Sequence, residues 1–185
     1  MAIEAELKAR VSDVDAVRKE LRQRAVEEVA VYRDTYYDRP GHELTGQGRE
    51  LRVRVVERDG GRRVLLTYKA PPVDEASESK PEYETRAESP EALDAILRGL
   101  GFEHLVSLVK HCANFTFTVG ARECTATLVT VPELDGTFLE VETIVGDDEL
   151  QDGLATVRRV LGDLGIGDAD LTTEQYTDAV MAIRR

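Results

Sequence analysis

In the opening stretch MAIEAELKAR (1–10), residues 3–10 alternate between apolar and charged side chains without a break. The apolar set is Ile3, Ala5, Leu7 and Ala9, and the charged set is Glu4, Glu6, Lys8 and Arg10. A period of two predicts a β-strand with one apolar face and one charged face. The charged face either meets water or lines a site, and the remaining strands bear on that choice.

The composition favours one domain and excludes several classes of protein. We expect a single domain over residues 1–185 with an aliphatic core, because aromatic residues make up 5% of the chain and Trp is absent. A formal net charge of −12 argues against binding to nucleic acid or to an anionic membrane, since both need a basic surface. The N-terminus lacks a basic segment followed by a hydrophobic one, so we expect a cytoplasmic protein with Cys112 and Cys124 reduced.

Charged residues recur on one face of the later predicted strands. They are Arg52 and Arg54 in 51–55, Lys69 in 62–70, Glu82 and Glu84 on a further strand, Lys110 in 105–119, and Glu140 and Glu142 in 137–145. The two later carboxylate pairs repeat the spacing of Glu4 and Glu6, which predicts related positions around one sheet. Extended segments are also expected at 33–38 and 122–131, hairpin turns at 59–61 and Gly120, and a solvated loop at 71–80.

Amphipathic helices are predicted between these strands. Ser12 is expected to cap a helix whose apolar residues are Val14, Val17 and Leu21. Ser89 and Pro90 are expected to begin a second helix that stops near Gly101. Its buried stripe is predicted to be Leu93, Ile96, Leu97 and Leu100. Two helices around 150–164 and 173–183 close the chain.

The helices need the apolar face of the sheet, so the charged faces must all point the other way. About eight strands with their charged faces inward close into an antiparallel barrel, which also removes edge strands. We therefore predict an α+β fold, an eight-stranded antiparallel β-barrel with amphipathic helices outside. Buried charge at this density is prohibitive when unpaired but is consistent with a water-filled tunnel. Its carboxylates suit Mg²⁺ or Mn²⁺, and its Arg and Lys residues suit phosphates.

The charged pattern resembles the CYTH superfamily, the triphosphate tunnel metalloenzymes. Glu4-x-Glu6-x-Lys8 is similar to the superfamily's ExExK signature. Further matching stretches, in the expected order, are LRVR (51–54), TYKAP (67–71), Lys80 with EYE (82–84), Lys110, GTFLEVE (136–142) and QYTDAV (175–180). The match covers nearly the whole chain, and the class IV adenylate cyclase-like branch is the most similar.

The resemblance implies a tunnel that binds a triphosphate with Mg²⁺ or Mn²⁺. It implies metal-side carboxylates at Glu4, Glu6, Glu140 and Glu142. It implies substrate-binding residues at Lys8, Arg52, Arg54, Lys69, Lys80, Lys110, Glu82 and Glu84, with catalytic roles for Lys8, Glu6, Arg54 and Lys69. The implied partner is a nucleoside triphosphate or another triphosphate compound, with no nucleic acid and no membrane. The oligomeric state, including a homodimer, stays open.

Two reactions are consistent with this resemblance: conversion of ATP to cyclic AMP and pyrophosphate, and triphosphate hydrolysis. The sequence does not separate them. Two positions depart from the family pattern. A Lys-x-Arg pair is usual where Lys110 is followed here by His111 and Cys112, and an Asp is usual where Val129 or Thr130 stands. A triphosphate-binding protein with weakened or lost catalysis is therefore the second hypothesis. The third is a structural α+β domain whose charged strand faces are exposed to solvent.

Overall fold

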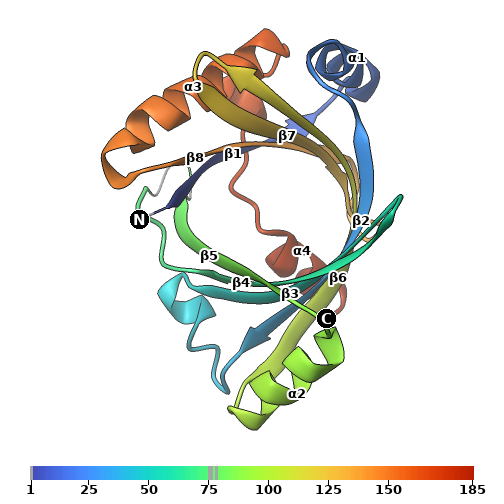
Figure 1. Cartoon of the computed structure of the whole chain (residues 1–185), viewed down its shortest axis with the longest axis vertical. Helices are drawn as coiled ribbons and strands as arrows, with labels where there is room; N and C mark the ends of the chain where they lie inside the picture. Colours follow the sequence, from blue (N-terminus) through green and yellow to red (C-terminus); the bar gives the residue numbers. More distant parts are fainter. Residues whose placement is uncertain (1, 75–76, 78) are drawn as a thin grey trace.

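The computed structural model describes residues 2–74, 77 and 79–185, and it contains one closed antiparallel barrel with the strand order β1-β5-β4-β3-β2-β6-β7-β8 (Figure 1). The strands are β1 (Ile3–Val11), β2 (Glu28–Asp38), β3 (Glu50–Arg58), β4 (Gly61–Lys69), β5 (Lys80–Ala87), β6 (Glu103–Val119), β7 (Arg122–Thr130) and β8 (Thr137–Val145). The helices are α1 (Val14–Arg24), α2 (Pro90–Gly99), α3 (Leu150–Asp163) and α4 (Tyr176–Ile183). The predicted α+β barrel with eight antiparallel strands is confirmed. Met1, Glu75, Ala76 and Glu78 lie outside the described residues, so the loop predicted at 71–80 is described only in part.

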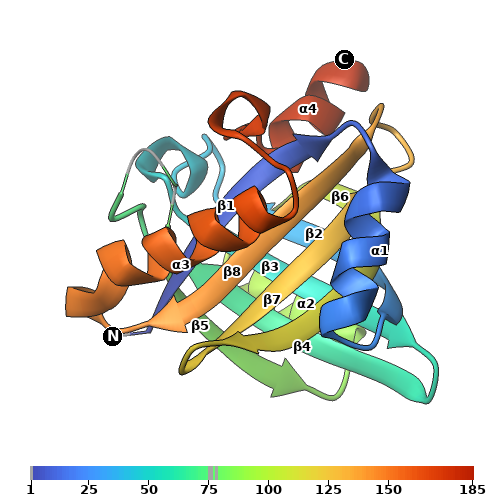
Figure 2. The ribbon, with the colours of Figure 1, turned by 90° about the horizontal axis from the view of Figure 1, so that it is seen from above.

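The alternation in β1 separates the helix-covered outside of the barrel from its charged inside. Ala5 and Ala9 are fully buried, and Leu7 is nearly so, in the largest apolar cluster of the described chain. Helix α3 lies along β1 and β8 on this outer face (Figure 2) and contributes Val157 and Val160 to the same cluster. Glu4, Glu6 and Lys8 therefore point into the barrel.

Gly153 allows α3 to approach the sheet closely. A Cβ at this position would lie 2.8 Å from Cγ1 of Val145 and 3.2 Å from Cβ of Ala5. Gly153→Ala is expected to lower the free energy of unfolding by about 1–3 kcal/mol because the core is overpacked. The matched control is Gly162→Ala on the same helix, where the added Cβ meets nothing within 4 Å. We expect that change to stabilise the protein by about 0.5–1 kcal/mol through helix propensity. Urea unfolding of both variants tests whether α3 packs this closely on the sheet at Gly153. Stabilisation of both variants would contradict the close packing.

Three helix predictions need correction. Asp13, not Ser12, caps α1, because its side chain accepts the N–H of Ala16 at 3.0 Å. Ile96 and Leu100 are 56% and 61% exposed, so the prediction that they are buried is wrong. Helix α2 contacts β3 through one narrow stripe. Within it, Leu97 is buried in an apolar cluster that also includes Leu51 and Val53. The last helix begins at Tyr176 rather than at 173.

The C-terminal segment covers one end of the barrel. Leu171 forms a β-bridge with Ala9, and the N–H of Thr172 donates to the carbonyl of Lys8 at 2.9 Å. Helix α4 then contacts β6 and, in the view into the barrel, lies within the ring of strands (Figure 1). Part of the cavity wall is thereby formed by Leu171, Thr172, Thr173, Gln175, Tyr176 and Thr177.

Candidate active site

A strongly charged cavity of about 260 Å³ occupies the barrel interior. Its charged lining residues are Glu4, Glu6, Lys8, Glu50, Arg52, Arg54, Lys69, Lys80, Lys110, Glu140 and Glu142. The predicted charged strand faces thus meet in one space, as the barrel interpretation required. Glu82 and Glu84 stand outside this lining. Glu82 pairs with Lys69 at 3.1 Å, and the more exposed Glu84 accepts a hydrogen bond from Thr67 at 2.9 Å.

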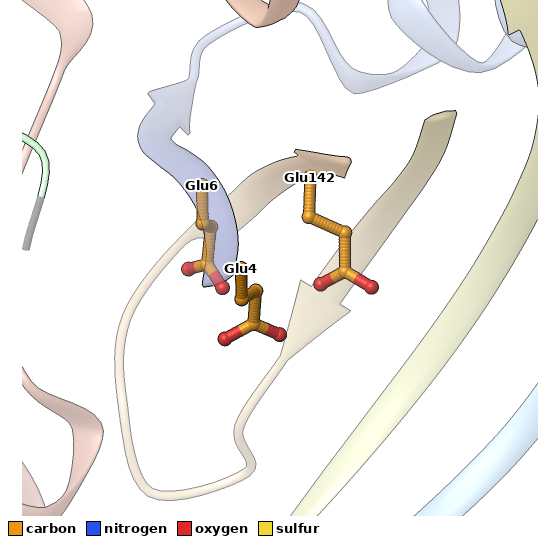
Figure 3. A group of neighbouring side chains, drawn as sticks. All are labelled: Glu4, Glu6 and Glu142. Atoms are coloured by element: carbon orange, nitrogen blue, oxygen red, sulfur yellow. The ribbon is translucent and has the colours of Figure 1, made fainter. Parts of the chain in front are cut away.

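Three carboxylates gather on one side of the cavity. Glu4 and Glu6 come from β1, and Glu142 comes from β8, where it stands directly opposite Glu6. One carboxylate oxygen of each lies within 4.8 Å of the others (Figure 3). Glu140 is two residues along β8 and is outside this group. It stands opposite Lys8, and its Oε1 is 3.7 Å from Nζ of Lys110.

The carboxylate group is short of compensating positive charge. Burial, together with Glu140 and Glu4, raises the pKa of Glu6 to about 7. Burial, together with Glu4 and Glu6, raises the pKa of Glu142 well above its ordinary value. At Glu4, burial opposes ionisation, but the Lys69 ammonium in direct contact outweighs it and lowers the pKa. Crowded carboxylates that resist ionisation are stabilised by an added cation.

These three residues fit a divalent metal ion. They offer hard oxygen donors, which Mg²⁺ and Mn²⁺ prefer. Oxygens on opposite sides of one Mg²⁺ are about 4.2 Å apart, which is close to the 4.8 Å within which the three carboxylate oxygens lie. The repulsion that raises the pKa values of Glu6 and Glu142 is what such an ion relieves.

The apoprotein is expected to lose stability as the pH rises from about 5 to about 8. The pKa of Glu6 is raised from 4.5 to about 7 on folding, so within this window the folded chain binds more protons than the unfolded chain. The free energy of unfolding therefore falls with rising pH, by on the order of 2 kcal/mol. Metal binds the deprotonated carboxylates, so Mg²⁺ or Mn²⁺ should restore stability at about pH 8 and do little at about pH 5. Thermal unfolding with and without metal checks this, and an equal metal effect at both pH values contradicts it.

Arg54 is fixed on the opposite wall by a buried aspartate. Nε and Nη2 of Arg54 donate to the two carboxylate oxygens of Asp34, both at 2.7 Å, while the guanidinium lies 4.5 Å from the ring centroid of Tyr32. Nη1 of Arg52 lies 3.9 Å from the same carboxylate. Burial opposes the charge of Asp34, but Arg54 and Arg52 hold its pKa well below the usual range. Bidentate pairing gives Arg54 one defined orientation.

No pattern in the sequence singles out Asp34. It stands on β2 opposite Arg54, but the extended segment predicted at 33–38 is too short to show which face is inward. The observed strand starts at Glu28, and its inward face then includes Tyr32, Asp34 and Tyr36. If the strand had been predicted from Glu28 onward, its alternation would have placed Asp34 on the inward face.

Lys69 stands between the two walls of the cavity. Its ammonium contacts Glu4 directly and lies 3.1 Å from Glu82. These carboxylates raise the pKa of Lys69 well above its ordinary value although burial opposes the charge. Lys80 stands opposite Glu4 where β5 meets β1. Lys69 therefore carries positive charge next to the carboxylate group, and Lys80 lies beside it in register with Glu4.

Lys8 and Lys110 meet on the aromatic ring of Tyr176. The ring centroid lies 4.6 Å from Nζ of Lys8 and 4.3 Å from Nζ of Lys110. Burial and the neighbouring Glu140 raise the pKa of Tyr176, so its hydroxyl stays protonated. No strand pattern in the sequence places Tyr176 here, because this residue belongs to helix α4.

The two departures from the family pattern face each other across one strand pair. Cys112 on β6 stands directly opposite Val129 on β7, and their side chains are 3% and 0% exposed. Both belong to one apolar cluster that also includes Phe138 and Tyr176. An uncharged pair at these positions leaves neither a buried cation nor a buried carboxylate without its partner.

Comparisons with known proteins agree with this geometry. The sequence profile of the CYTH domain matches residues 2–176. The Methanocaldococcus jannaschii protein named "putative adenylate cyclase MJ0240" is 25% identical over 179 residues, covering 95% of this chain and 97% of its own. The PH1819 protein from Pyrococcus horikoshii superimposes with a TM-score of 0.85 at 28% identity, covering 98% of this chain and 99% of its own.

A plant structure shares the fold at lower identity. The Hippeastrum protein HpAC1, described as a "putative adenylyl cyclase" that reveals a dominant triphosphatase activity, gives a TM-score of 0.68 at 16% identity. It covers 98% of this chain and 96% of its own. No helix among the described residues is long and apolar enough to span a membrane.

Proposed function

Because the chain belongs to the CYTH domain family, we propose that it is a metal-dependent enzyme that acts on a triphosphate in its barrel interior. The reaction is either the class IV cyclase type, from ATP to cyclic AMP and pyrophosphate, or triphosphate hydrolysis. The whole chain, residues 1–185, would act as one tunnel domain. The substrate is a nucleoside triphosphate or another compound with a triphosphate group.

The separation of charges within one cavity carries this proposal. Glu4, Glu6 and Glu142 form an acidic group that fits a metal ion, while Arg52 and Arg54 lie on another wall. A cation chelated by a polyphosphate presents positive charge on one side and negative oxygens on the other, which matches both walls. Carboxylates packed so closely that their pKa values rise are typical of functional sites.

Every charged lining residue except Glu50 has a role in this scheme. Glu4, Glu6 and Glu142 would hold the metal, and Glu140 lies beside Lys8 and Lys110. The phosphate oxygens are bound by Lys8, Arg52, Arg54, Lys69, Lys80 and Lys110. A bound divalent ion supplies neutralisation of phosphate charge and orientation of the triphosphate. Arg54 and Lys69 are already oriented by Asp34 and Glu4, so little reorganisation is needed when charge develops in the transition state. Glu82 and Glu84 extend the same strand face at the edge of the site.

The two reactions differ in the nucleophile and in the phosphorus attacked. In cyclisation the ribose 3′-hydroxyl attacks the α-phosphorus, and pyrophosphate leaves. In hydrolysis water attacks the terminal phosphorus, and orthophosphate leaves. Both transition states spread negative charge over phosphoryl oxygens, so both use the same cation wall.

A triphosphate-binding protein without turnover is the second candidate. The apolar contact between Cys112 and Val129 favours it, because the pair supplies no charge to a transition state. The enzyme remains the first choice because this change removes one charge of each sign from neighbouring positions. The acidic group and the Asp34–Arg54 pair remain complete.

Product analysis with two substrates tests the proposal. We would incubate the protein with ATP or tripolyphosphate, with Mg²⁺, Mn²⁺ or a chelator, and measure orthophosphate, pyrophosphate and cyclic AMP separately. Metal-dependent release of a product supports the enzyme, and its identity assigns the reaction. Tight calorimetric binding without product supports the binding protein. If neither compound is bound or consumed, the proposed function is wrong.

A further inference from the structure

Tyr176 touches both lysines at the covered end of the cavity although it comes from a helix outside the sheet. Its ring lies within 4.6 Å of Nζ of Lys8 and 4.3 Å of Nζ of Lys110, and its side chain is 5% exposed. A cation that lies over an aromatic face is attracted by the ring quadrupole. The ring attracts both ammonium groups without cancelling their charge, which a carboxylate would do.

The position of Tyr176 is itself well determined. Its ring packs edge-on against Phe138 with a centroid distance of 5.1 Å, and Val180 one turn later is fully buried in the same cluster. The preceding segment is tied to β1 through the hydrogen bond from Thr172 to the carbonyl of Lys8. The C-terminal segment therefore fixes Lys8 twice, once at its backbone and once at its ammonium group.

Glu140 is the group that competes for these lysines. Its Oε1 lies 3.7 Å from Nζ of Lys110, and it stands opposite Lys8 on the neighbouring strand. If both ammonium groups closed onto this carboxylate, they would attract phosphate less strongly. The ring of Tyr176 provides a neutral alternative contact for each of them.

We propose that Tyr176 is a positioning residue whose ring limits the closure of Lys8 and Lys110 onto Glu140 and keeps both ammonium groups available to substrate phosphates. This inference rests on the proposed function, because it assumes that the cavity binds a triphosphate. It adds a residue from α4 to a site otherwise built from strands.

Calorimetric titration with tripolyphosphate at fixed Mg²⁺ tests the role of the ring. Tyr176→Phe keeps the ring and is expected to bind within about twofold of the wild type. Tyr176→Leu and Tyr176→Met remove the ring and are expected to weaken binding by about tenfold. The dependence of affinity on salt concentration should also become shallower, because Lys8 and Lys110 would contribute less to attracting the phosphates. Met, which is flexible enough to fill the space, is the second variant in case Leu does not fold.

Val180→Ala is the matched packing control. It loosens the same helix in the same apolar cluster and is expected to lower the melting temperature while leaving the affinity for tripolyphosphate unchanged. If Val180→Ala weakens binding as much as Tyr176→Leu, Tyr176 acts only through packing and the inference is wrong. Unchanged or tighter binding by both ring-less variants also overturns it, and tighter binding would mean that the ring occupies the place of a phosphate. If the wild type binds no tripolyphosphate, this inference and the proposed function fail together.

Discussion

Glu6→Gln is expected to reduce metal-dependent turnover at least about 100-fold, because it removes an oxygen ligand and a charge from the centre of the acidic group. The same change should make the apoprotein more stable at neutral pH. Burial and the neighbouring Glu140 and Glu4 raise the pKa of Glu6 to about 7, so a neutral side chain relieves repulsion there. Lost activity with gained stability is a signature that misfolding does not produce.

The measurements for Glu6→Gln are initial rates at saturating Mg²⁺ and thermal unfolding without metal. Glu57→Gln is the matched control, because Glu57 lies on the outer face of β3 and pairs with Arg33. That variant should change neither quantity by much, since an exposed ion pair contributes about 0–1 kcal/mol. Turnover by Glu6→Gln within about threefold of the wild type would exclude Glu6 as a metal ligand.

Asp34→Ala is expected to lower the free energy of unfolding by about 3–5 kcal/mol. It leaves Arg54 buried without its bidentate partner and removes the carboxylate that lies 3.9 Å from Arg52. The two guanidinium groups, both largely buried, would then repel each other without a carboxylate between them. This loss is a large part of the 5–15 kcal/mol that stabilises a typical domain.

Urea unfolding of single and double variants separates stability from function. Asp34→Ala with Arg54→Met removes both buried charges, so we expect it to recover part of the lost stability. Turnover should not recover, because Arg54 is proposed to bind phosphate. If Asp34→Ala costs less than about 1 kcal/mol, water or another group compensates Arg54, and Asp34 does not hold it.

The barrel and most of its lining are predictable because they depend on a period of two. The alternation in residues 3–10 assigns one face to α3 and the other to the cavity, and a one-residue shift would reverse both. The same rule places Arg52 and Arg54 inside. It does not say which inward residues meet across the barrel, because that depends on register and shear.

Contacts between strands that are distant in the sequence explain where the observed site differs from the predicted one. Glu140 and Glu142 share a face in the sequence, but only Glu142 joins Glu4 and Glu6, since β8 places Glu140 beside Lys110. Tyr176 is not predictable from a strand pattern because α4 reaches the cavity only after the C-terminal segment crosses β1. The exposure of Ile96 and Leu100 has a related cause. Helix periodicity shows which residues share a face, but it does not show how wide the buried part of that face is.

A crystal structure with Mn²⁺ and a non-hydrolysable ATP analogue is the most direct test of the central claim, that the barrel binds a triphosphate through a metal on three carboxylates. We expect an anomalous Mn²⁺ peak bonded to oxygens of Glu4, Glu6 and Glu142. We also expect phosphate oxygens in contact with Lys8, Arg52, Arg54, Lys69 and Lys110. An analogue bound outside the barrel, or Mn²⁺ bound without any of the three carboxylates, would contradict the claim.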